Sequence, residues 1–162
     1  MNHERLRLKA ADPQDLAVIA ACLQDARIPL REMAFMPGER RFAAAFVRYR
    51  RELLADPTSC VGLTECPSAL VFEGVAEVKY RGLDPNDLDR ELCLLTIATE
   101  PGRRHLIHID LVFEGDVWIQ LRTDAIRCRL EDFGEAVPCR RTPCDHFAKA
   151  SYAELAGDAA PA

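Results

Sequence analysis

Hydrophobic and polar residues alternate most regularly between Ser68 and Arg81. Apolar or small residues fall on one face of this segment, and charged residues fall mainly on the other. Because successive side chains of a strand point to opposite faces, the pattern predicts a strand with one buried and one wet face. Gly74 keeps the phase of the alternation, so we interpret it as a bend or a close-contact point, not as a register-shifting bulge.

Further strands are predicted on both sides of this segment. The run from Glu91 to Thr99 is more uniformly apolar, which is typical of a central strand covered on both faces. Leu106 to Phe113 and Val117 to Arg122 flank Glu114-Gly115-Asp116, which predicts a hairpin with a short turn. Arg5 to Lys9 is a candidate edge strand.

Two helices are predicted, one near each end of the chain. Asp12 and Pro13 form an N-cap and first-position pair, and the helix is expected to run to about Gln24. Thr123 can cap a second helix, which closes at Gly134. Its apolar side would carry Ile126, Leu130 and Phe133.

The segment from Phe35 to Arg51 reads as either helix or strand. Phe42, Phe46 and Tyr49 recur at helical spacing, and this periodicity alone favours a helix. In the alternative, Met33 to Met36 and Arg40 to Tyr49 form a hairpin about Pro37-Gly38, which are suitable residues for a tight turn.

Several of these segments resemble a bacterial family, domain of unknown function 2948, typical of alphaproteobacteria. The resemblance is carried by the passage Phe35 to Phe42, the block Ala69 to Phe72, the run Leu92 to Ile97, the hairpin Ile109 to Leu121 and the segment Ile126 to Gly134. It covers about residues 5–146, and its motifs are structural residues without a catalytic signature. The resemblance implies a compact, mostly antiparallel β domain with few helices, which favours the strand interpretation of Arg40 to Tyr49.

Two positions depart from the pattern of that family. Tyr49-Arg50-Arg51-Glu52 stands where an aromatic-rich end of the motif is expected, and Gly115-Asp116 stands where a glycine pair is usual. Taken together, the segments predict a single α+β domain over residues 1–147, with a flexible tail over residues 148–162. We expect an antiparallel sheet curled into a sandwich or a partly open barrel, with an N-terminal helix and a helix near the C-terminus.

Composition and charge narrow the class of protein. The content of 49% hydrophobic and 29% charged residues is ordinary for a soluble globular domain. No apolar run approaches the roughly 20 residues that span a bilayer, and the charged N-terminus lacks the apolar core of a signal peptide. We therefore expect a cytoplasmic protein that does not bind membranes and whose seven cysteines are thiols.

The strongest metal-binding candidate is the pattern Cys139-x4-Cys144-x-His146. Thiolate and imidazole are the ligands that zinc prefers, but three ligands are one short of a tetrahedral set. Cys60 or Cys66 could supply the fourth ligand if the two loops meet. The hypothesis is a zinc-binding module or a small metal-dependent enzyme; otherwise these residues are ordinary loop thiols and no cofactor is expected.

Support for catalysis is weak elsewhere in the chain. His108 and Asp110 share a strand face and could orient an imidazole for general-base chemistry, but no nucleophile accompanies them. Neither a G-x-S-x-G elbow nor a phosphate-binding loop occurs. We therefore expect a non-enzymatic protein.

Binding of a macromolecular partner, most simply another protein, is the leading hypothesis. Trp118 and Arg122 project from the face opposite the apolar residues of their strand, unless a second layer such as the N-terminal helix covers them. Residues 26–51 carry seven arginines against two glutamates, in a chain whose net charge is −5. Arg40, Arg41 and Arg48 complete the candidate contact residues. Single-stranded nucleic acid is the alternative partner, although strand geometry would divide the arginines between two faces.

Overall fold

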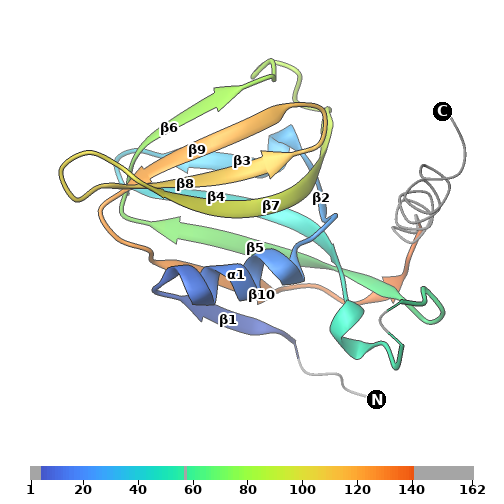
Figure 1. Ribbon diagram of the computed structural model, residues 1–162. Coiled ribbons are helices and arrows are strands. Elements are labelled where there is room, and N and C mark those ends of the chain that lie inside the picture. Colours follow the sequence, from blue (N-terminus) through green and yellow to red (C-terminus); the bar gives the residue numbers. More distant parts are fainter. Residues whose placement is uncertain (1–4, 57, 141–162) are drawn as a thin grey trace, which may run out of the picture.

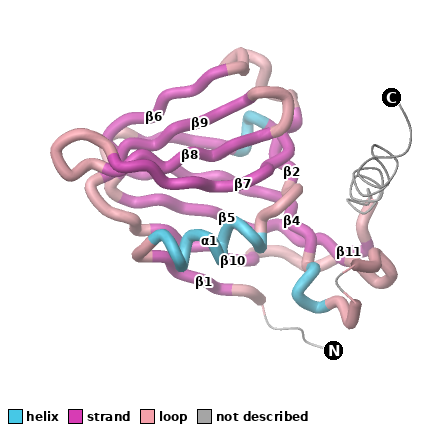
Figure 2. Tube along the Cα trace, in the orientation of Figure 1, coloured by secondary structure: helices cyan, strands magenta, loops and turns pink. Residues whose placement is uncertain are grey.

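Residues 5–56 and 58–140 are described by the computed structural model (Figures 1 and 2). They form one open, curved, antiparallel sheet in the order β1-β10-β5-β4-β2-β7-β8-β9-β6, with β3 added beside β4 and β11 beside β5. Within these residues there is a single α-helix, and two 3-10 turns span Leu30–Glu32 and Arg51–Leu53. The elements are β1 (Arg7–Ala10), α1 (Pro13–Cys22), β2 (Arg27–Pro29), β3 (Met33–Met36), β4 (Arg41–Tyr49), β5 (Thr64–Glu73), β6 (Val75–Arg81), β7 (Glu91–Pro101), β8 (Ile107–Phe113), β9 (Val117–Thr123), β10 (Cys128–Asp132) and β11 (Val137–Pro138).

The helix α1 begins where the sequence predicts it. The side chain of Asp12 accepts a hydrogen bond from the backbone N of Asp15 at 2.8 Å, and Pro13 opens the first turn. Leu16 and Ile19 are fully buried, and α1 packs between β1 and β7 (Figure 1). The helix therefore fills the space inside the curved sheet. None of the helical segments in the described residues is long and apolar enough to cross a membrane.

The ambiguous arginine-rich segment forms a strand. Met33–Met36 and Arg41–Tyr49 pair as a hairpin, with Phe35 opposite Phe42 and the turn at Pro37-Gly38. On its other edge β4 pairs with β5 over nine residues. Because both edges of β4 are hydrogen-bonded by neighbours, tertiary pairing overrides the helical periodicity of this segment. The strand interpretation that follows from the family resemblance is the one observed.

The segment from Ser68 to Arg81 is two strands, not one. The chain breaks at Gly74, whose φ of +74° favours glycine, and passes from β5, which pairs with β4 and β10, to β6, which pairs with β9. Val75 is fully buried and Ala76 is exposed, and the β6–β9 register shifts between Val75 and Glu77. The prediction that the alternation keeps its phase through Gly74 is therefore wrong.

The second predicted helix is also wrong. Cys128–Asp132 is the strand β10, which pairs with β1 on one side and β5 on the other. Cys128, Leu130 and Asp132 are buried at a period of two, whereas Phe133, which a helix would have buried, is 52% exposed. Two flanking strands supply the backbone partners here, so local capping signals do not decide the structure. Likewise, β7 is not covered on both faces, because Leu95 is 40% exposed.

Candidate functional site

Trp118 lies on the face of β9 that points away from the core. Val117, Ile119 and Leu121 are buried on the core side, while Trp118 is half-buried on the other side. Its neighbours across the sheet are Arg81 of β6 and Val112 of β8. The main contacts of α1 are with β1 and β7, so the helix is not the layer over Trp118.

The guanidinium group of Arg81 lies over the indole ring of Trp118. The guanidinium carbon is 5.4 Å from the centroid of the ring. At this distance a cation is attracted by the negative face of the aromatic ring. The contact places a positive charge directly next to the Trp118 ring.

Arg122 lies four residues after Trp118, on the same face of β9. Its Nη1 atom is 2.9 Å from Oε2 of Glu77, and its side chain remains 43% exposed. The Nε atom of Arg122 is buried and has no hydrogen-bond partner among the described residues. The exposed part of the guanidinium, which is shared with Glu77, is what a bound partner could contact.

Asp110 and Gln120 lie between these two residues and interact with each other. The Nε2 atom of Gln120 donates to Oδ1 of Asp110 at 2.9 Å, and Asp110 is only 5% exposed. In the sheet register His108 lies opposite Arg122. The Asp110 carboxylate is thus occupied by an amide, which does not support a His108–Asp110 catalytic pair. We call this surface, which comprises Glu77, Lys79, Arg81, His108, Asp110, Trp118, Gln120 and Arg122, the Trp118 face.

Arg40 and Arg41 lie at the far end of β6 from Trp118. The carbonyl of Arg40 accepts a hydrogen bond from the backbone N of Val75, the first residue of β6, whereas Trp118 is opposite the last residue, Arg81. Seven residues of strand separate the two ends by about 20 Å. The Nε atom of Arg41 is bonded to Glu73 at 2.8 Å. The structure therefore does not bring these arginines together with Trp118.

Arg48 is buried and is not part of any surface. Its side chain is 1% exposed, because residue 48 falls on the same face of β4 as Phe42 and Phe46. Nε and Nη2 of Arg48 bind the two carboxylate oxygens of Asp132 at 2.7 and 2.8 Å, and Nη2 lies 2.8 Å from Glu52. The prediction of Arg48 as a partner-binding residue is corrected by this placement.

Asp132 is the centre of a buried hydrogen-bond network that sequence reasoning missed. Its carboxylate also accepts hydrogen bonds from the hydroxyl of Ser68 and from the backbone N of Leu6. Burial alone would raise the pKa of Asp132, but the hydrogen bonds from Arg48, Ser68 and Leu6 outweigh it and lower the pKa to about 2. One signal was present in the sequence: an arginine at a core position of a strand requires a buried carboxylate partner.

A second ionic cluster covers the other face of β4. Arg27 is bonded to Glu65, and the guanidinium carbons of Arg27 and Arg51 lie 5.8 and 5.5 Å from the centroid of the Tyr49 ring. Arg51 also donates to Asp25 at 2.8 Å. Of the two arginines that follow Tyr49 in the motif, Arg50 is only 7% exposed, and the side chain of Arg51 is 22% exposed and paired with Asp25. This arrangement removes most of the positive patch on which nucleic-acid binding would depend.

The proposed zinc site falls partly outside the described residues. Cys144 and His146 lie there, while Cys139 is a half-buried free thiol whose backbone N donates to the carbonyl of Leu63 at 3.4 Å. Burial raises the pKa of both Cys139 and Cys66, which favours the thiol over the metal-binding thiolate. In the part of the chain that the structure describes, no group of three or more histidine, cysteine or acidic residues could hold a metal ion. Cys60 is disulfide-bonded, so the expectation of a thiol is wrong at that position.

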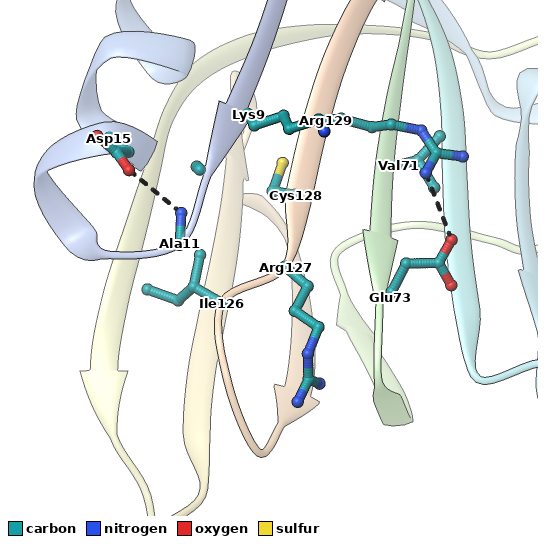
Figure 3. Close-up of a pocket in the computed structure, with 10 residues that line it drawn as sticks. Lys9, Ala11, Asp15, Val71, Glu73, Ile126, Arg127, Cys128 and Arg129 are labelled. Atoms are coloured by element: carbon teal, nitrogen blue, oxygen red, sulfur yellow. Dashed lines mark hydrogen bonds and ion pairs between the residues drawn. The ribbon is translucent and has the colours of Figure 1, made fainter.

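Figure 3 shows a cavity of about 280 Å³ at β1, β10 and β5, beside the start of α1. Its two arginines are engaged: Arg129 lies 3.9 Å from Glu73, and Arg127 lies 3.0 Å from Asp124. The thiol of Cys128 faces this region from β10, and burial raises its pKa to about 12. The ion-paired arginines and the protonated thiol do not form a catalytic arrangement.

Comparison with known proteins gives a family and no activity. A family model matches residues 6–145, and its description is "Protein of unknown function (DUF2948)". No curated protein and no solved structure matches the chain. The match confirms the resemblance drawn from the sequence motifs and covers nearly all of the described residues.

Proposed function

The chain belongs to the family described as "Protein of unknown function (DUF2948)", and from its geometry we propose that the protein binds a second protein through the Trp118 face. The observation that carries the proposal is the stacking of Arg81 on Trp118, 5.4 Å from the ring centroid, on the side of β9 away from the core. Tryptophan and arginine are the residues that most often dominate the binding energy of protein interfaces.

The charges on this face favour an acidic partner. Lys79, Arg81 and Arg122 carry positive charge, against Glu77 and Asp110. Glu77 is shared between Arg122 at 2.9 Å and Lys79 at 4.0 Å, and Asp110 accepts from Gln120. Arg81 is thus the most available cation, beside the aromatic ring. Complementary charge would steer an acidic surface toward the face and fix its orientation.

Two other hypotheses have weaker support. Single-stranded nucleic acid needs basic side chains along an accessible groove, but Arg48 is buried and Arg41 is held by Glu73. A zinc module or metal-dependent enzyme would depend on Cys139 together with Cys144 and His146, and the last two lie outside the described residues. Neither hypothesis has a geometric observation comparable with the Arg81–Trp118 contact.

The test is an affinity isolation from cell extract, followed by quantitative binding of the recovered protein. Trp118→Ala should raise the Kd by about 30-fold, the loss of about 2 kcal/mol expected for a central interface residue. Arg122→Ala should weaken binding less and should reduce its dependence on salt. Val18→Ala is the matched control, because Val18 is an apolar residue of α1 that is 55% exposed.

Unchanged affinity of Trp118→Ala, in a variant whose thermal unfolding is like that of the wild type, would rule out this face. Recovery of RNA or DNA in place of a protein would favour the nucleic-acid alternative. In that case the affinity for a labelled oligonucleotide must fall as salt is added.

A further inference from the structure

An apolar groove opens between β3 and β6, on the side of β6 opposite to the Trp118 face. Val78 and Tyr80 line it from β6, because strand alternation places them on the face away from Lys79 and Arg81. Met33 and Phe35 line it from β3, and Leu83 and Leu88 line it from the segment that follows β6. The groove has a volume of about 270 Å³, and none of its lining residues is charged.

Large apolar side chains at this groove remain in contact with solvent. Tyr80 is 51% exposed and Leu88 is 52% exposed, while Phe42 and Ile119 below them belong to the buried core. A single exposed apolar side chain is ordinary, but two at the mouth of a groove that leads to the core are typical of an interaction site. The groove is therefore an extension of the core that a side chain from another molecule could fill.

The segments that flank the groove carry negative charge. Residues 30–36 and 82–90 contain Glu32, Asp84, Asp87 and Asp89 against Arg31 and Arg90, a difference of two negative charges. Arg31 is paired with Asp89, and Nη1 of Arg90 donates to the carbonyl of Gly82 at 2.9 Å. Asp84 and Asp87 are exposed, and no basic side chain is paired with them among the described residues.

We propose that this groove binds a hydrophobic anchor side chain of a protein segment that also carries lysine or arginine. The apolar lining selects the anchor, and the exposed carboxylates at the rim select the positive charge beside it. The groove is a second docking surface, distinct from the Trp118 face in both residues and charge. The two faces of β6 would then take partners of opposite charge, an acidic one over Trp118 and a basic one over Tyr80.

The experiment uses the full chain as the target for a random-peptide display library. The selected peptides should combine an aromatic or aliphatic residue with lysine or arginine. The Kd of a labelled synthetic copy of the best peptide is then measured by fluorescence anisotropy. Leu88→Asp should raise the Kd of the peptide at least about tenfold, because the substitution places a polar group in the apolar lining. Val61→Asp is the control, since Val61 is 86% exposed and is not a lining residue of the groove.

Charge at the rim is tested separately. The double substitution Asp84→Lys and Asp87→Lys should weaken the binding of the peptide several-fold and reduce the salt dependence of its Kd. Glu135→Lys, at an exposed position near β11, should change neither. No enrichment, enrichment of acidic peptides, or equal binding by Leu88→Asp would overturn the proposal. Trp118→Ala should bind the peptide normally. Loss of binding in that variant would place the peptide on the Trp118 face instead, which also overturns it.

Discussion

The two ends of the core face of β4 are equally buried but chemically opposite. At one end Phe42 packs opposite Phe72 of β5, and at the other Arg48 lies opposite Cys66. Phe42, at the apolar end, is 3% exposed, and Arg48, at the polar end, is 1% exposed. At the apolar end, burial is favourable because it removes apolar area from water. At the polar end, burial of a charge is tolerated because the charge is paired and hydrogen-bonded.

The two ends differ in whether their contacts depend on the direction between the interacting atoms. Apolar contacts are non-directional and tolerate repacking, whereas the Asp132 carboxylate needs Arg48, Ser68 and Leu6 at fixed positions. These residues come from β4, β5, β10 and the segment just before β1. The polar end therefore fixes how four segments meet, while the apolar end mainly contributes burial. The first three predictions below each change one end, and the last changes an exposed ion pair for comparison.

The largest effect is expected for Arg48→Ala. Removal of the guanidinium leaves the Asp132 carboxylate buried without its main partner, which should cost about 3–5 kcal/mol of unfolding free energy. Chemical denaturation with guanidinium chloride measures the loss. The double variant Arg48→Met, Asp132→Leu is the control, because it removes both charges and should recover much of that stability. A cost below about 1 kcal/mol for Arg48→Ala would show that the pair contributes little.

Acid should weaken the polar end before the apolar end. The pKa of Asp132 is about 2 in the folded protein, against 3.8 for a free carboxyl group. A lowered pKa stabilises the fold fully above about pH 4, and this contribution of roughly 2 kcal/mol is lost as the pH falls from about 4 through 2. Unfolding free energies measured across this range should show the slope. Asp132→Asn should have a smaller slope, and an equal slope in both proteins would contradict the assignment.

Elements of the fold that depend on neighbouring residues could be predicted from the sequence, and elements that depend on distant residues could not. The start of α1 at Asp12-Pro13 and the β8–β9 hairpin depend on neighbouring residues, and both are visible in the sequence. The switch at Gly74 and the strand at Cys128–Asp132 depend on partners far along the chain, and both were mispredicted. Strand pairing supplied from a distance overrides local periodicity.

The candidate site likewise combines a placement that the sequence predicts with contacts that it does not. Alternation along β9 was enough to place Trp118 and Arg122 on the face away from the core. That Arg81 stacks on Trp118 could not be predicted, because the β6–β9 register includes a shift between Val75 and Glu77. The Arg48–Asp132 pair joins residues 84 positions apart, and no local pattern points to such a partner.

The apolar end should respond more weakly to a conservative change. Phe42→Leu keeps the position apolar and removes some volume, so it should cost about 1–1.5 kcal/mol. Because repacking is available here, the cost should be well below that of Arg48→Ala, measured by the same denaturation. A loss as large as that of Arg48→Ala would mean that the apolar end is no more tolerant than the polar end. The comparison between the two ends would then fail.

The smallest effect is expected for an ion pair that is not buried. Arg7 of β1 lies 3.8 Å from Glu131 of β10, and the two side chains are 76% and 41% exposed. Arg7→Ala should change the unfolding free energy by less than about 0.5 kcal/mol, because exposed pairs are screened by water and salt. Because guanidinium chloride itself screens charges, this variant is measured by urea denaturation, and the difference from the wild type should vanish in 0.5–1 M salt. A cost near that of Arg48→Ala would mean that closure of β1 on β10 depends on charge at the surface.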